Sequence, residues 1–266
     1  MQSYSGTLVN NKFVIGVLLA ICAMVFDGIG GAVAAELSPT LEKLKAALDM
    51  DHRSQENRER DENRSPVKAM AFCGLRDDMT VIEFGPGSGW YTEIIGPVLQ
   101  EKGALYISYK EKWMAKLDTL LTNDFMSAVK KHPVDIDWNS EEKHFDVGEI
   151  VFDGIKADMA LNIREYHNFN TEGAAKMNAA IFAALKPGGR YCIIDHTRRH
   201  MEARHNEVRR RADPVQVIKE VQAAGFVFSD WSNLFFKPDD ELRYEVGRKT
   251  VTGNTDRFSL LFIKPE

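Results

Sequence analysis

The 266-residue sequence has few cysteines, no excess of basic residues and no internal repeat. Its 34 lysines and arginines are outnumbered by 39 aspartates and glutamates, which gives a formal net charge of −5. A general nucleic-acid-binding protein needs a basic field, so this balance argues against that class of partner. The hydrophobic content of 44% and charged content of 27% are those of an ordinary globular protein. No change of composition along the chain marks a second domain.

The three cysteines are too few for a disulfide framework. Cys22 lies in an N-terminal apolar run, which leaves Cys73 and Cys192 in the rest of the chain. An oxidising compartment would allow these two to pair. Cys192, however, lies inside an apolar strand pattern, and we therefore expect a buried thiol there.

The N-terminus has the pattern of a targeting segment. Residues 13–26 are almost unbroken apolar sequence after the single positive charge of Lys12, and residues 32–34 read Ala-Val-Ala, the form of a cleavage site. The run is too short to span a bilayer comfortably. We predict a signal peptide over residues 1–35 and an exported protein, periplasmic or secreted, with no stable membrane span after cleavage. An uncleaved anchor is the alternative.

A helical extension is predicted for residues 36–75, followed by one domain over residues 76–266. Within that domain strand and helix patterns alternate, which predicts a mostly parallel sheet covered on both faces. The expected strands are 80–84, 104–108, 134–138, 157–163, 189–195, 226–231 and 257–263, and the expected helices are 90–99, 111–121, 171–185 and 214–224. The last two strands are expected to pair antiparallel. The densely charged residues 51–64 are interpreted as a solvated helix or linker.

A glycine-rich turn joins the first expected strand to its helix. The strand ends at Glu83, and Gly85, Gly87 and Gly89 follow at alternate positions. Glycine permits positive φ and a close approach of the backbone to a ligand, and the helix start just beyond offers free N–H groups. The spacing is not that of the dinucleotide-binding fingerprint. A tight turn in some other α/β protein is the alternative reading of the glycines alone.

The pattern from Glu83 to Thr92 resembles motif I of the class I S-adenosylmethionine (SAM) dependent methyltransferases. A second resemblance is the helix, Leu-Lys-Pro-Gly-Gly and strand passage at residues 179–195. The resemblance covers residues 66–264. It implies a Rossmann-like fold, with a mostly parallel seven-stranded sheet, an antiparallel edge strand and helices on both faces. It also implies SAM as the cofactor.

The whole chain is similar to a family of exported bacterial methyltransferases that carry signal peptides. The shared features are an arginine-rich segment before the first strand, the glycine motif, an Arg-x-x-His after the fourth strand and an Ala-Gly-Phe before the sixth. In this sequence they are Arg60–Pro66, Pro86–Thr92, Arg164–His167 and Ala224–Phe226.

The carboxyl ends of the strands of an open α/β sheet form the ligand crevice. By the resemblance, the cofactor contacts are Glu83, Gly85, Pro86, Gly87, Gly89, Tyr91, Ser108, Tyr109, Asn162 and Arg164. The family usually has an acid at the end of strand two for the ribose hydroxyls, whereas this chain has Ser108-Tyr109-Lys110 and then Glu111. Three readings follow: Glu111 reaches the ribose, Ser108 and Tyr109 make weaker contacts, or SAM is not bound.

The candidate catalytic residues are His167, Tyr166 and His196. A histidine accepts a proton near neutral pH, so His167 after strand four fits a general base for an O–H, N–H or S–H acceptor. The alternative is that His167 and Asn168 cap the next helix or tie down a loop. Tyr166 is equally suited to an acceptor-site wall or to the core.

Histidines and arginines gather after strand five. Asp195, His196 and His200 have spacing that permits a metal site, but no known signature matches and we expect no metal. Residues 198–211 contain six arginines, read either as a solvated face or as a lid that clamps an anionic acceptor.

The sequence therefore predicts an exported SAM-dependent methyltransferase that acts on a small-molecule nucleophile, which the lid reading of residues 198–211 makes an anionic one. Two alternatives remain. One is a ligand- or metal-binding protein on a methyltransferase scaffold without methyl transfer. The other is a lyase or isomerase that uses the same pocket.

Overall fold

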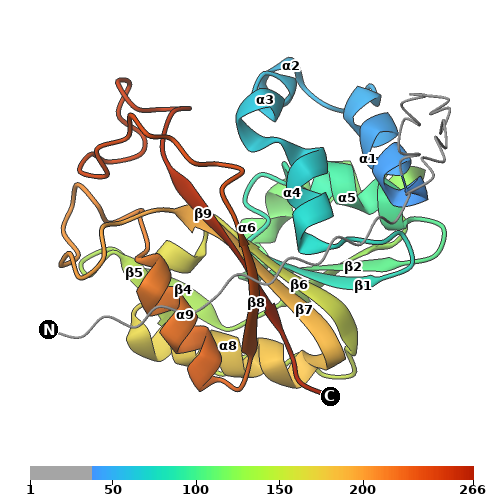
Figure 1. The fold of residues 1–266 in the computed structure, drawn as a ribbon. Helices are drawn as coiled ribbons and strands as arrows, with labels where there is room; N and C mark the ends of the chain where they lie inside the picture. Colours follow the sequence, from blue (N-terminus) through green and yellow to red (C-terminus); the bar gives the residue numbers. More distant parts are fainter. Residues whose placement is uncertain (1–37) are drawn as a thin grey trace, which may run out of the picture. The chain divides into compact units, whose positions relative to one another are not determined.

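A seven-stranded sheet forms the centre of residues 38–266, which are the residues that the computed structural model describes (Figure 1). Its strands are β1 (Thr80–Phe84), β2 (Ala104–Tyr109), β3 (Val129–Pro133), β6 (Ala157–Ile163), β7 (Leu185–His196), β8 (Val227–Ser232) and β9 (Arg257–Ile263). They lie in the order β3-β2-β1-β6-β7-β9-β8. The pairs from β3 to β7 are parallel, and β9 runs antiparallel to both β7 and β8. The predicted sheet and its antiparallel pair are confirmed.

Helices cover both faces of this sheet (Figure 1). The first group is α1 (Pro39–Asp49), α2 (Gln55–Arg58), α3 (Asp61–Arg64), α4 (Pro66–Cys73) and α5 (Thr92–Leu99), and the second is α8 (Thr171–Ala184) and α9 (Pro214–Ala223). Between β2 and β3 the expected long helix is broken into α6 (Glu111–Met114), η1 (Ala115–Leu117) and α7 (Asp118–Leu121), and η2 (Asp124–Met126) follows. η3 (Tyr166–Asn168) follows β6.

Alternating side chains of the strands build two apolar cores, one on each face. Val81 of β1 packs in the core that includes Ile94 of α5. Its neighbour Ile82 packs in the core that includes Ile181 of α8 and Val217 of α9. The sheet is thus buried on both sides, as a parallel sheet requires.

The third strand is not where the sequence pattern placed it. Residues 134–138 were expected to form it, but β3 is Val129–Pro133 and pairs parallel with β2. Residues 136–139 instead form β4 (Ile136–Asn139), which pairs with β5 (His144–Val147) in a separate two-stranded sheet. The cause is physical, because β3 is an edge strand with two lysines and a histidine, and such a strand has no apolar alternation to detect.

The expected free thiol at Cys192 is also wrong. Cys192 in β7 and Cys73 at the end of α4 are both fully buried and form a disulfide, with Cα atoms 5.5 Å apart. The apolar pattern correctly indicated burial. It could not indicate that α4 lies against β7 at this point.

The predicted start of α9 is confirmed. The Asp213 side chain accepts hydrogen bonds from the backbone N–H groups of Val215 and Gln216, and Pro214 occupies the first turn. No helix among residues 38–266 combines the length and apolar character needed to cross a membrane. The predicted signal peptide lies outside the described residues.

Candidate functional site

A cavity of about 290 Å³ opens at the carboxyl ends of β1, β6 and β7. Eight of the residues predicted from the sequence line it: Glu83, Gly85, Pro86, Gly87, Tyr91, Arg164, His167 and His196. They lie at or just after the ends of three neighbouring parallel strands, and these ends meet at the same edge of the sheet. We call this the first cavity.

The glycine turn shapes one wall of the first cavity. Gly85, Gly87 and Gly89 have φ of 66°, 60° and 84°, in the region that side chains disfavour. A Cβ on Gly87 would meet no atom within 4 Å, although Gly87 lines the cavity, so the missing side chain leaves space there. A Cβ on Gly89 would instead lie 2.7 Å from the Leu117 side chain. The absence of a side chain at Gly87 therefore keeps space open in the cavity, whereas at Gly89 it allows Leu117 to pack closely.

The Glu83 carboxylate lies at the base of the same wall. It is nearly fully buried, and its Oε2 accepts a hydrogen bond of 2.7 Å from the Thr92 hydroxyl. Burial raises the pKa of Glu83 to about 7, although the hydrogen bond from Thr92 opposes this. No cationic side chain among residues 38–266 forms an ion pair with it. A cationic ligand group in the first cavity would supply one.

An aspartate orients His167. The two oxygens of Asp195 lie 2.8 and 3.0 Å from His167 Nδ1, and Oδ2 also accepts the backbone N–H of His167. Asp195 is fully buried at the end of β7. A carboxylate on Nδ1 holds the proton there and leaves Nε2 as the acceptor. The helix-cap reading of His167 is wrong, because the cap of α8 is Asn170.

His196 has both ring nitrogens engaged. Arg164 Nε donates to Nε2 at 3.1 Å, and Nδ1 lies 3.0 Å from the Thr255 hydroxyl. Burial and then the charge of Arg164 lower the pKa of His196 well below its usual value. His196 is thus a neutral positioning residue for Arg164. Arg164 itself has φ of 64°, a strained conformation for a residue with a side chain.

Other predicted site residues lie away from the first cavity. Ser108 and Asn162 are fully buried within the sheet and do not line it. Tyr166 is buried, donates to Glu220 at 3.0 Å and accepts from Asn178 at 2.9 Å. Its hydroxyl is thus committed to the core beneath α8 and α9. Glu111 at the start of α6 is exposed and does not line the first cavity.

Glu165 is the acid that the sequence interpretation missed. Its Oε2 accepts hydrogen bonds from the Tyr109 hydroxyl at 3.2 Å and from Asn168 at 2.9 Å. It lines the first cavity and also a neighbouring cavity of about 580 Å³, walled by the rings of Tyr109, Trp113 and Phe145. The Glu165 carboxylate, which belongs to the segment after β6, therefore lies beside the end of β2. Burial raises its pKa.

A second cavity, of about 310 Å³, adjoins the first and shares Arg60, Arg64, Arg164 and His196 with it. Arg257 lines it as well, whereas no aspartate or glutamate among the described residues does. The Arg64 guanidinium lies 4.5 Å from the centre of the Trp90 ring. Burial and then Arg164 lower the pKa of Arg64 to about 9, so it remains charged at neutral pH.

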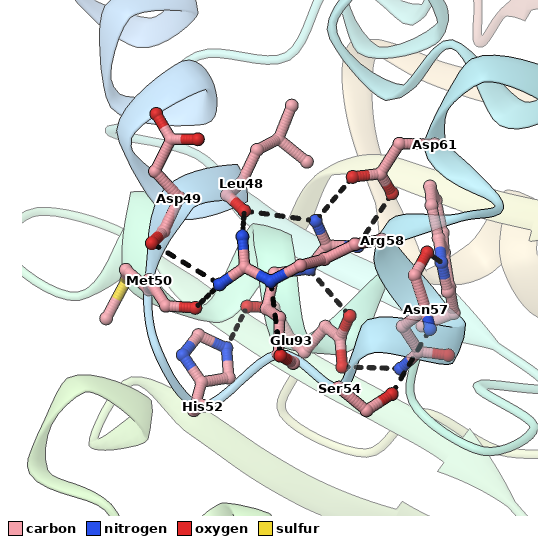
Figure 2. Close-up of polar contacts among 11 residues, drawn as sticks. Leu48, Asp49, Met50, His52, Ser54, Asn57, Arg58, Asp61 and Glu93 are labelled. Carbon is pink, nitrogen blue, oxygen red and sulfur yellow. Dashed lines mark hydrogen bonds and ion pairs between the residues drawn. The ribbon is translucent and has the colours of Figure 1, made fainter.

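The charged residues 51–64, which we call the lead-in segment, bring two of these arginines to the site. Arg53 is fully buried and pairs with Asp61 and with Glu93 of α5, each at 2.7 Å. Figure 2 shows the neighbouring contacts, with Arg58 directed at backbone oxygens of residues 48–50 and Asn57 bonded to Glu93. The interpretation of this segment as solvated is wrong for Arg53 and Arg64.

The arginines at 198–211, read from the sequence as a solvated face or as a lid over an anionic acceptor, do not gather around the first cavity. Arg211 is buried in a two-bond ion pair with Asp240, and Arg210 pairs with Glu245. Arg199 donates to a backbone oxygen. Of the six, only Arg210 lines the first cavity.

The possible metal ligands are held apart by other partners. Asp195 bonds to His167 and His200 to Asp213. Residues 38–266 contain no group of three histidine, cysteine or acidic side chains placed to hold a metal ion.

Comparison with known proteins identifies the fold. No family model and no curated protein matches the chain. A SAM-dependent methyltransferase from Aquifex aeolicus superposes with a TM-score of 0.55 and 16% identity, over 84% of this chain and 98% of that one. The chain has the methyltransferase fold.

Two further solved structures show how varied the chemistry on this fold is. The glycopeptide N-methyltransferase MtfA, in complex with S-adenosyl-L-homocysteine, gives a TM-score of 0.52 at 14% identity, over 77% of this chain and 89% of that one. The cyclase SpnF gives 0.55 at 16% identity, over 82% and 86%. At these identities the likeness concerns the fold, and the reaction must be argued from the site.

Proposed function

We propose that the protein is a SAM-dependent methyltransferase that acts on a small-molecule nucleophile. The observation that carries this is the convergence of two features on one cavity. The glycine turn leaves space at Gly87, and His167 in η3, oriented by Asp195, lines the same cavity. A donor-binding wall and a proton acceptor in one cavity are the two parts that methyl transfer to an X–H group needs.

The residues present fit SAM. Glu83 is a buried carboxylate without a cationic partner among the described residues, and the ammonium of the methionine part would supply one. Glu165 provides the carboxylate for the ribose hydroxyls that β2 lacks. The rings of Tyr109, Trp113 and Phe145, on the far side of Glu165, offer stacking surfaces for the adenine. We therefore favour an arrangement that is not among the three readings drawn from the sequence, in which Glu165 binds the ribose.

The cofactor, when bound, supplies an electrophilic methyl group whose carbon–sulfur electrons stay with sulfur on transfer. The chain's own residues align the acceptor and take its proton. His167 Nε2 accepts the proton that the acceptor O–H, N–H or S–H loses as the new bond to carbon forms. Asp195 stabilises the imidazolium so produced. His196 holds the Arg164 guanidinium at the junction of the two cavities.

Titration with SAM and S-adenosylhomocysteine tests this proposal, followed by product analysis with radiolabelled SAM. Gly87→Val fills the space at the turn with a branched side chain and is expected to weaken binding by at least about tenfold, or about 1.4 kcal/mol. Circular dichroism checks that the variant folds. An affinity equal to that of the parent would show that the turn does not hold the ligand.

A second candidate function is non-methyl-transfer chemistry in the same pocket, a lyase or isomerase. The similarity to the cyclase SpnF supports keeping it, because the fold there carries a different reaction. Bound SAM without label transfer to any acceptor would favour this candidate. Absence of SAM binding would favour the ligand-binding scaffold.

We also propose that the protein is exported. The predicted signal peptide of residues 1–35 motivates this, and the Cys73–Cys192 disulfide supports it, since such bonds persist in oxidising compartments. Expression with its own leader should give a mature chain that begins at Ala35 or Glu36. N-terminal sequencing that returns Met1 from a cytoplasmic fraction would contradict export.

A further inference from the structure

The second cavity is lined by positively charged side chains that have no carboxylate partner among residues 38–266. Arg60, Arg64, Arg164 and Arg257 line it, and none of the four forms an ion pair with a carboxylate anywhere in residues 38–266. Elsewhere the chain pairs its buried arginines, as Arg53 shows. Arg64 and Arg257 are buried, and an unpaired buried charge is costly, so a ligand with negative charge would stabilise this cluster.

Some N–H groups of these guanidinium side chains also have no hydrogen-bond acceptor among the described residues. Arg257 is 7% exposed, and its buried Nε has no hydrogen-bond partner among the described residues. Arg64 is 9% exposed, and its guanidinium lies over the Trp90 ring and forms no side-chain hydrogen bond within residues 38–266. Burial together with the neighbouring guanidinium charges lowers the pKa of both residues. Guanidinium forks with free N–H groups bind carboxylate and phosphate through two parallel bonds.

SAM alone cannot balance four guanidinium groups. It has a single carboxylate, and its ammonium and sulfonium give the molecule a net positive charge. The acids Glu83 and Glu165 lie on the side of the first cavity, and no acid among the described residues lines the second. The counter-charge has to come with the other ligand.

We propose that the methyl acceptor is an anion with at least two negative charges, phosphate or carboxylate, which the second cavity binds through Arg60, Arg64, Arg164 and Arg257. This inference rests on the proposed methyl transfer, because it takes the occupant of the second cavity to be the acceptor. Arg164 and His196 line both cavities, so an acceptor held by its anionic end extends its nucleophile towards His167. This pocket lies at a different place from the six arginines of residues 198–211, none of which lines it.

Titration calorimetry with pyrophosphate and with succinate, at an ionic strength held constant with sodium chloride, tests the site and separates the phosphate and carboxylate sources. We expect one of the two to bind at least about tenfold more tightly than acetate. Arg60→Met and Arg257→Met should each weaken that binding by at least about tenfold. Arg76→Met is the matched control, because Arg76 is exposed, pairs with Asp78 and lines neither cavity.

The same preparations are titrated with SAM and S-adenosylhomocysteine. A bound dianion should raise the affinity for SAM relative to S-adenosylhomocysteine by at least about threefold, because only SAM has the sulfonium charge. Arg257→Met should leave the affinity for S-adenosylhomocysteine within about threefold, since Arg257 does not line the first cavity. If Arg257→Met fails to fold, Arg60→Met still tests the site.

The outcomes separate this inference from the proposed function. If S-adenosylhomocysteine binds and neither dianion does, the anionic acceptor is wrong and the methyltransferase proposal stands. Dianion binding that Arg60→Met and Arg257→Met leave unchanged, or that excludes S-adenosylhomocysteine, also overturns the acceptor site. If a dianion binds but neither SAM nor S-adenosylhomocysteine does, the proposed function fails and the occupant is not a methyl acceptor.

Discussion

At the scale of single residues, hydrogen-bond partners decide which histidine has a free acceptor. Asp195 engages only Nδ1 of His167, whereas Arg164 and Thr255 engage both ring nitrogens of His196. Two histidines that border one cavity thus have different chemistry. The sequence places both near the pocket, but it does not reveal their partners, which come from three other segments.

His167→Ala is expected to lower turnover by a factor of about 10²–10⁴, the usual contribution of a general base. The affinity for SAM should change little, because the glycine turn remains. Steady-state kinetics and calorimetry measure the two effects separately. His196→Ala is the matched comparison and should cost less turnover, since His196 acts through Arg164. The reverse order of losses would place the base on β7.

Glu83→Gln is expected to change how stability depends on pH. Burial raises the pKa of Glu83 from 4.5 to about 7, so the folded state favours the protonated form. Below pH 4.5 both states are protonated and no penalty exists. As pH rises from 4.5 to 7 the unfolded chain ionises first, and wild-type stability falls by up to about 3 kcal/mol. Glutamine keeps the Thr92 hydrogen bond and lacks this loss.

Denaturant unfolding at pH 5 and pH 8 checks the prediction. The stability difference between Glu83→Gln and the wild type should move in favour of the variant at pH 8. An equal difference at both pH values would show that the Glu83 carboxyl has an ordinary pKa in the folded protein.

At the scale of elements, the lead-in segment shows what composition conceals. Residues 51–64 read as a solvated charged stretch, yet Arg53 is buried against Asp61 and Glu93. The central strands, α8 and the start of α9 were predictable because they are apolar, periodic or capped. The edge strand β3 and the lead-in segment were not, since long-range pairing partners determine both.

Arg53→Met is expected to destabilise the fold by about 3–5 kcal/mol, because it leaves the buried Glu93 carboxylate without its ion-pair partner. It should also weaken dianion binding, since the same segment holds Arg60 and Arg64. Thermal unfolding measures the first effect. Arg243→Met is the control: Arg243 and Glu241 are exposed, so the loss there should be at most about 1 kcal/mol. Equal losses in the two variants would contradict the role of the segment.

At the scale of the whole molecule, acidic side chains border only one of two adjoining cavities. Glu83 and Glu165 line the first but not the second, whereas Arg60, Arg64 and Arg164 line both and Arg257 lines the second. This division is independent of the fold likeness, because arginines from the lead-in segment, the loop after β6 and β9 create it. The net charge of −5 gives no hint of it, since a whole-chain sum hides local separation.

The Cys73–Cys192 disulfide ties the N-terminal helices to the central sheet across a sequence separation of 119 residues. A bond that closes so long a loop restricts the unfolded chain, and its removal typically costs about 2–5 kcal/mol. The double variant Cys73→Ala/Cys192→Ala should therefore unfold at lower denaturant concentration than the oxidised wild type. Reductant should lower wild-type stability towards that of the variant and leave the variant unchanged. Two free thiols counted by mass spectrometry in oxidised, exported protein, with stability insensitive to reductant, would show that the pair does not form.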